Sequence, residues 1–222
     1  MNNITVWGFS WAPPFAQGLV RDMRVRWALE EAGLPYAVSL IDFDERNAPA
    51  YLQRQPFGMV PAFAADGHEL FESGAIVYRI AEESSALLPI AARDRIDTLV
   101  WMFAALNTVE PPLQNLLLID IQDSGEQWAV LRRPGAMDAV RVRLRVLAEQ
   151  LEGRDYLLEH FTAADILMAT VLRLIRHTGL VAEWPVLAAY VARCEARPAF
   201  QRALRGQLQD YERNAPAQGA LN

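Results

Sequence analysis

Lysine is missing from this chain of 222 residues, in which all 21 basic residues are arginine. Without lysine there is no Schiff-base nucleophile and no phosphate-binding P-loop, because both need an ammonium group on a flexible stem. Cysteine is nearly absent too: Cys194 stands alone, which excludes a disulfide framework and a zinc site built from thiolates. The three histidines show no metal-ligand spacing, so we predict no metal site.

Two further absences bear on location and partners. No uninterrupted apolar run reaches the roughly eighteen residues that a membrane-spanning helix needs. The first residues lack the basic and apolar regions of a secretory signal, which predicts a cytoplasmic protein. The net charge of −6 disfavours nucleic-acid binding, which usually relies on a basic face. We therefore expect neither a membrane nor a nucleic acid as partner.

The first part of the chain alternates between strand and helix patterns. We predict strands at 4–9, 36–41, 60–64 and 69–71, and helices at 20–33, at 49–53 and from an N-cap at Ser73. Asp66-Gly67 predicts an antiparallel hairpin between the last two strands. The order βαβαββα is typical of a thioredoxin-like domain.

The rest of the chain shows only helical spacing. Helices are predicted at 94–119, 137–151, 165–178 and 185–196, with a kink or break at Pro111-Pro112. Thr162 and Asp165 have the spacing of a capping box, whose role is in folding. We predict two domains, one α+β and one all-α: residues 1–83 are thioredoxin-like, 84–92 a linker, 93–210 a helical bundle and 211–222 a loose tail.

Three segments resemble the glutathione transferase family: Gln55–Ala62, Leu70–Ile76 and Phe161–Asp165. A fourth, Arg24–Tyr36, is similar to the first helix of many bacterial members. The resemblance covers nearly the whole chain and implies the same two-domain fold. It also implies glutathione as co-substrate and a homodimer.

The resemblance carries glutathione-binding roles onto particular residues. It implies that Pro61 follows a cis peptide bond and that the backbone of Val60 pairs with the cysteinyl part of glutathione. Glu72 and Ser73 match the acid and hydroxyl that hold the γ-glutamyl end. Met59 stands where relatives often have a basic residue, so Arg46 is our candidate for the glycyl carboxylate.

The catalytic position departs from the family pattern. Relatives place a Ser, Cys or Tyr near the end of the first strand, and Ser10 is the best hydroxyl here, with Trp11 and Phe15 as pocket residues. Either the segment 10–18 is an insertion or the following helix starts earlier, near Pro13 or Pro14. Ser10 could donate to the sulfur of glutathione and favour its thiolate.

A hydrophobic substrate site is expected on the first long helix, where the family has it, with Trp101, Phe103 and Asn107 as candidates. Plain core packing is the alternative for the two aromatic residues.

The expected function is a glutathione transferase that activates the thiol for attack on a small hydrophobic electrophile. The alternatives are a non-catalytic dimeric binding or regulatory protein, and a glutathione-dependent disulfide reductase or peroxidase. Segment 8–12 is one residue short of a serine-hydrolase elbow, but its place on the first strand disfavours that chemistry.

Overall fold

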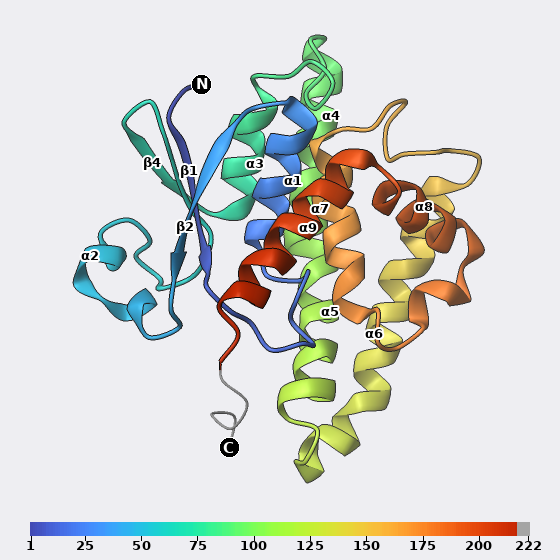
Figure 1. Ribbon diagram of the computed structural model, residues 1–222. Helices are drawn as coiled ribbons and strands as arrows, with labels where there is room; N and C mark the ends of the chain where they lie inside the picture. Colours follow the sequence, from blue (N-terminus) through green and yellow to red (C-terminus); the bar gives the residue numbers. More distant parts are fainter. Residues whose placement is uncertain (217–222) are drawn as a thin grey trace. The chain divides into compact units, whose positions relative to one another are not determined.

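The computed structural model describes residues 1–216, which form two compact units (Figure 1). Unit 1 contains Met1–Ser84 together with the segment that starts at Pro198, and unit 2 contains Ser85–Arg197. None of the helices within residues 1–216 is both long and apolar enough to cross a membrane.

Unit 1 is built on a four-stranded sheet whose strands lie within two residues of their predicted bounds. The strands are β1 (Ile4–Phe9), β2 (Tyr36–Ile41), β3 (Ala62–Ala65) and β4 (His68–Phe71). Their order is β2-β1-β3-β4, with β1 parallel to β2 and antiparallel to β3, and β3 antiparallel to β4. Asp66 and Gly67 both have positive φ, as the predicted hairpin requires. The thioredoxin-like topology is thus confirmed.

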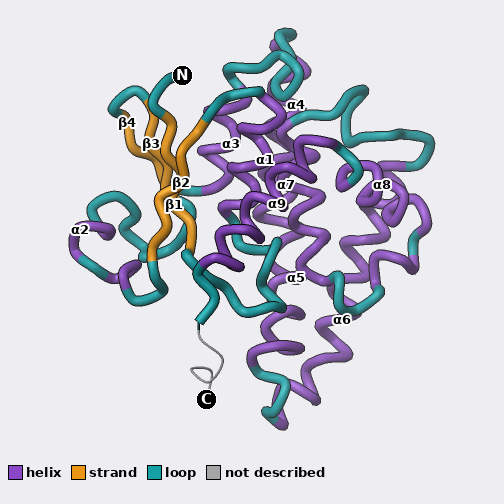
Figure 2. The backbone as a smooth tube through the Cα atoms, viewed as in Figure 1, coloured by secondary structure: helices purple, strands orange, loops and turns teal. Residues whose placement is uncertain are grey.

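The sheet of unit 1 has α1 (Asp22–Ala32) and α3 (Ser73–Ala81) on one face and α2 (Pro49–Leu52) on the other (Figure 2). Alternate residues of β1 are fully buried, because they point to the side that α1 and α3 cover. On the other face, Tyr51 of α2 packs in a small apolar cluster with Ile41, Val60 and Ala62.

The last helix of unit 1, α9 (Pro198–Arg213), corrects the prediction for the end of the chain. The polar sequence from Gly206 predicts a loose tail over 211–222, but 211–213 form the last turn of α9. Its buried residues recur every three or four positions, and Phe200 packs edge-on against Trp27 of α1 with ring centroids 4.9 Å apart. Residues 217–222 lie outside the described part of the chain.

The regular elements of unit 2 are all helical, as predicted, and a loop over 152–162 separates two of its helices. Its longer elements are α4 (Ala92–Phe103), the wide π-helical turn η2 (Ala104–Val109), α5 (Glu110–Leu117), a second wide turn η3 (Leu118–Gln122), α6 (Gln127–Leu151), α7 (Ala163–Leu172) and α8 (Pro185–Glu195). No break occurs at Pro111, because the wide turn directly before it changes the hydrogen-bond pattern where a proline has no N–H to donate.

The capping box at the start of α7 is confirmed. The Asp165 carboxylate accepts hydrogen bonds from the amides of Thr162 (2.8 Å) and Leu157 (3.0 Å) and from the Tyr190 hydroxyl (2.9 Å). Burial raises the pKa of this carboxyl above its ordinary value, and these donors counteract the effect. All ten residues of α7 are buried, so the box fixes the start of a core helix.

Candidate functional site

The register of the sheet brings three predicted site segments to one edge of unit 1. The pairing of β1 with β3 sets Trp7 opposite Ala62, and the pairing of β3 with β4 sets Ala62 opposite Phe71. Continued by one residue, the β3–β4 register places Pro61 opposite Glu72. The register of β1 with β3, continued in the same way, places Ser10 one residue beyond the level of Val60 and Pro61. Residues 10, 59–61 and 72–73 therefore share one end of the sheet.

The Val60–Pro61 peptide bond is cis, as the family resemblance implies. Val60 is buried, yet its amide and carbonyl have no hydrogen-bond partner within residues 1–216. The preceding carbonyl, of Met59, accepts a hydrogen bond of 2.7 Å from the Tyr51 hydroxyl, whose pKa burial raises to about 12. A neutral phenol thus anchors the loop and leaves the Val60 peptide groups available to a ligand.

Glu72 has an unusual backbone conformation for a residue with a side chain, with φ 71° and ψ 109°. Strained positions of this kind cluster at functional sites, where the surrounding structure holds them. Its carboxylate is exposed and has no partner among the described residues.

Ser73 differs in detail from its prediction. It is the first residue of α3 and not the N-cap, which is Glu72, and no side chain caps the helix. The Ser73 hydroxyl instead accepts a hydrogen bond of 3.2 Å from Arg24 of α1 and is buried. The first amides of α3 are therefore left for an anion, next to a carboxylate suited to an ammonium group.

Ser10 follows β1 directly, and its hydroxyl donates a hydrogen bond of 2.5 Å to the carboxylate of Asp42. Sequence reasoning missed Asp42, although the parallel pairing of 36–41 with 4–9 places the residues that follow each strand side by side. The helix α1 begins only at Asp22 and not near Pro13 or Pro14, and turns precede it in the segment after Ser10. Trp11 is half-buried and Phe15 is 51% exposed in this segment.

The segment after Ser10 is held by residues of α9 within the same unit. The Gln207 side chain accepts a hydrogen bond of 3.1 Å from the Gly18 amide and donates one of 2.6 Å to Asp22. Asp22 in turn binds Arg26 at 2.8 Å. The loop that carries the candidate catalytic residue is therefore tied to a buried polar network.

The remaining predicted residues differ in their contacts and exposure. Arg46 stacks on Phe43, with its guanidinium carbon 3.7 Å from the ring centroid, and Met59 is 42% exposed. In unit 2, Phe103 is exposed while Trp101 is half-buried, and two positions apart on a helix they point in different directions. Asn107 is exposed on the wide turn η2. The described residues contain no cluster of His, Cys, Asp and Glu that could hold a metal ion.

The sheet topology and the cis bond before Pro61 define a thioredoxin-like domain, which is followed by helices. Residues 17–82 match the family description "Glutathione S-transferase, N-terminal domain", and residues 133–198 match "Glutathione S-transferase, C-terminal domain". The chain belongs to the glutathione S-transferase family.

Individual relatives agree with this assignment. Glutathione S-transferase F9 of Arabidopsis thaliana is 35% identical over 96 residues, and the match spans 40% of this chain and 45% of that protein. The disulfide-bond oxidoreductase YfcG of Escherichia coli is 31% identical over 82% of this chain and 89% of that one. A glutathione transferase of Burkholderia graminis, solved with two glutathione molecules per subunit, is 26% identical, with a TM-score of 0.77 over 98% of this chain and 90% of that one.

Proposed function

We propose that this protein is a glutathione transferase, in which glutathione binds at the sheet edge formed by residues 10, 59–61 and 72–73. The observation that carries the proposal is the set of unpaired groups there: the Val60 peptide groups, the Glu72 carboxylate and the first amides of α3. They complement, in order, the peptide backbone, the ammonium and the carboxylate of a γ-glutamyl tripeptide. Arg46 is the proposed partner of the glycyl carboxylate.

The proposed chemistry is thiol activation followed by nucleophilic attack. The Ser10 hydroxyl turns from Asp42 to the glutathione sulfur and stabilises the thiolate, while the thiol proton leaves to solvent. The thiolate then forms a sulfur–carbon bond with a small hydrophobic electrophile, and the leaving group departs with the electron pair of its own bond. Trp11 and Phe15 are proposed to flank the tripeptide, and Trp101, Phe103 and Asn107 to contact the electrophile.

Calorimetric titration with reduced glutathione tests the binding site. Glu72→Ala and Ser73→Ala should each weaken binding by about 1–3 kcal/mol, the cost of a lost charged hydrogen-bond partner. Glu69→Ala removes a carboxylate of β4 that pairs with Arg54, and it should leave glutathione affinity unchanged. Absence of binding to the unmodified protein at millimolar glutathione would refute the proposal.

Ultraviolet absorbance of the bound thiolate against pH tests the role of Ser10. Ser10→Ala should move thiolate formation to higher pH, because the thiolate loses its hydrogen-bond donor. Asp42→Asn should move it to lower pH, because a negative charge near the sulfur is removed and the Ser10 hydroxyl is released. Unchanged profiles in both variants would show that another group activates the thiol.

A glutathione-dependent disulfide reductase is a second candidate, supported by the relative that is named a disulfide-bond oxidoreductase. Cys194 is buried and burial raises the pKa of its thiol, so it is not a resolving thiol. Two glutathione molecules would carry both reacting thiols: the first attacks the substrate disulfide and releases one thiol, and the second releases the other and leaves glutathione disulfide. Turnover of a small disulfide by glutathione, measured beside conjugation, separates the two activities.

We further propose that the protein is a cytoplasmic homodimer. Ile96, Val100 and Phe103 recur at helical spacing along α4 and are each more than half exposed, which suits burial against a second copy. Val100→Glu should shift the sedimentation coefficient toward the monomer, whereas Leu131→Glu, at a 76% exposed position of α6, should not. If the dimer persists in Val100→Glu, this face is not the interface. A dimer without glutathione binding would favour a non-catalytic role.

A further inference from the structure

The strand β2 forms an open edge of the sheet in unit 1, since it pairs only with β1. The Ile41 carbonyl accepts a hydrogen bond of 2.8 Å from the Ser10 amide, so the peptide groups of residue 41 point toward β1. The peptide groups of successive residues in a strand point to opposite sides, so the N–H and C=O groups of Tyr36, Val38 and Leu40 point away from β1. These outward groups have no partner within residues 1–216.

This edge lacks the features that usually prevent strand addition. Open edges are commonly protected by charged side chains, proline, a bulge or a covering segment. The six residues of β2 contain no charge and no proline, and their register with β1 is continuous, so there is no bulge. The edge is thus chemically ready to accept another strand.

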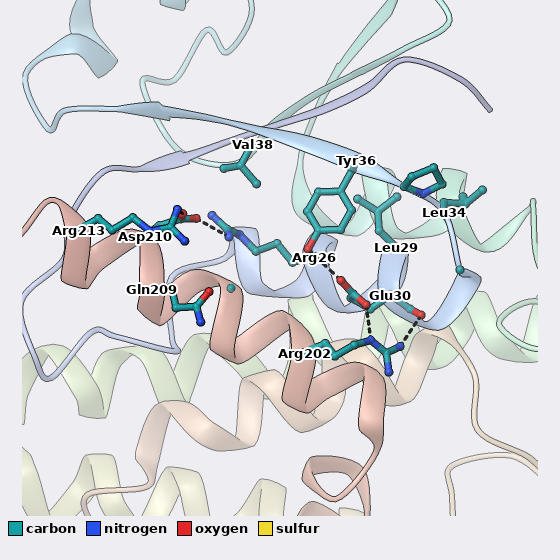
Figure 3. A pocket seen from close by; sticks show the side chains of 13 residues that line it. Arg26, Leu29, Glu30, Leu34, Tyr36, Val38, Arg202, Gln209, Asp210 and Arg213 are labelled. Atoms are coloured by element: carbon teal, nitrogen blue, oxygen red, sulfur yellow. Dashed lines mark hydrogen bonds and ion pairs between the residues drawn. The ribbon is translucent and has the colours of Figure 1, made fainter.

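A pocket of about 580 Å³ lies beside this edge, within unit 1. Figure 3 shows Tyr36 and Val38 of β2 pointing into it, toward side chains of α1 and α9. Leu29, Leu34 and Pro35 add apolar surface. Because alternate side chains of an added strand point to the same face, a peptide on the edge of β2 would place every second side chain in this pocket.

Among the charged side chains that line the pocket, Arg213 is the one without a close ionic partner in the described residues. Arg202 binds Glu30 at 2.6 Å, and Arg26 is shared between Asp210 at 2.7 Å and buried Asp22 at 2.8 Å. Arg213 has only a distant contact of 3.9 Å with Asp210, is 71% exposed and makes no hydrogen bond. The Gln209 amide, one turn earlier on α9, also makes none.

We propose that the edge of β2 and this pocket bind an extended peptide that carries a carboxylate, with its backbone paired to Tyr36, Val38 and Leu40 and its carboxylate on Arg213 and Gln209. This inference goes beyond the proposed transferase activity and uses none of its residues. A second copy of the chain is the competing occupant. The six residues of its β2 bring no carboxylate to Arg213, so we favour the acidic peptide.

The test uses a synthetic hexapeptide of alternating valine and threonine with a free carboxyl terminus. Nuclear magnetic resonance of the full chain should show slower amide exchange at Tyr36, Val38 and Leu40 on peptide addition, with no change at Ala37, Ser39 and Ile41. The C-terminal amide of the peptide should bind several-fold more weakly. A peptide N-methylated at alternate residues, which cannot donate to the edge, should not bind.

Two matched variants test the two halves of the site. Val38→Pro removes an outward N–H without breaking the pairing with β1 and should weaken binding about three- to tenfold, whereas Val38→Thr keeps the N–H and should bind normally. Arg213→Gln should abolish the difference between the acid and amide peptides. If Val38→Pro fails to fold, the N-methylated peptide on the unmodified chain still tests the edge.

Three results would overturn the proposal. The first is no change in exchange at millimolar peptide, and the second is equal binding of the N-methylated peptide. The third is protection of the outward amides that rises with protein concentration in the absence of peptide, because it would identify a second copy as the occupant.

Discussion

Replacement of Arg26 by leucine should strongly destabilise unit 1. The Arg26 side chain is 2% exposed and joins α1 to α9 by binding Asp22 at 2.8 Å and Asp210 at 2.7 Å. Asp22 is fully buried, and among residues 1–216 its one other side-chain donor is Gln207 at 2.6 Å. Leucine in place of Arg26 would therefore leave a buried carboxylate with a single neutral donor.

The size of the loss follows from two opposing contributions. With an effective dielectric constant of about 20, charges 2.8 Å apart attract by about 6 kcal/mol, much of which offsets the cost of removing both from water. Breaking a buried pair by deleting one partner typically costs about 3–5 kcal/mol, because the remaining charge is uncompensated. We expect a loss of this size in the free energy of unfolding at pH 7.

The loss should depend on pH in a defined direction. Burial raises the pKa of Asp22, and the charge of Arg26 opposes that rise. In the variant the pKa of Asp22 in the folded state rises further, so the folded state holds a proton that the unfolded state releases. The deficit should therefore be smallest at about pH 3, where Asp22 is mostly protonated in both states, and grow as the pH rises to 7.

Urea unfolding at several pH values, with hydrogen exchange of the α1 amides as a local probe of unit 1, measures this loss. Arg93→Leu is the control. The Arg93 side chain is 91% exposed and makes a weak contact of 3.9 Å with Asp97, so its loss should change the free energy of unfolding by less than about 1 kcal/mol. The double variant Arg26→Leu with Asp22→Asn should recover part of the loss. A deficit below about 1 kcal/mol, or one independent of pH, would refute the reasoning.

Three further predictions concern packing and reactivity. Asp165→Ala should cost about 3 kcal/mol or more in urea unfolding, because four buried donors lose their acceptor, whereas exposed Asp155→Ala should cost little; equal losses would contradict this. Gly8→Ala should cost about 1–3 kcal/mol and lower the melting temperature, because the added Cβ would lie 2.8 Å from a carboxylate oxygen of Asp22. Cys194 should not react with a thiol reagent in the native protein at mildly alkaline pH and should react in urea, because burial raises the pKa of its thiol; rapid native reaction would show that the helix opens.

The sequence predicts the elements of unit 1 well because the hydrophobic periodicity and the turn residues indicate the same boundaries there. Strand 4–9 has the alternation of a half-buried strand, Gly33 ends α1 in the left-handed conformation, and Asp66-Gly67 closes the hairpin. The cis bond before Pro61 follows from the family resemblance and not from spacing, since no local pattern distinguishes the two isomers.

The predictions fail where tertiary contacts determine which residues are buried or paired. The sequence of α9 is largely polar, but one side of the helix is buried. This buried side includes Gln207, whose side-chain amide forms hydrogen bonds with Gly18 and Asp22. The helix predicted at 137–151 starts too late, because α6 begins at Gln127 and runs through Pro134. The contact of Ser10 with Asp42 joins residues 32 positions apart and depends on the parallel pairing of their strands.

The place of α9 in unit 1 has a consequence for the order in which the chain folds during synthesis. Unit 2 is continuous in sequence and is complete once Arg197 has left the ribosome. Most of unit 1 is synthesised first, but Asp22 and Arg26 bind Gln207 and Asp210, which follow unit 2 in the sequence. The unit that starts the chain therefore completes its buried polar contacts only after all of unit 2 has been synthesised.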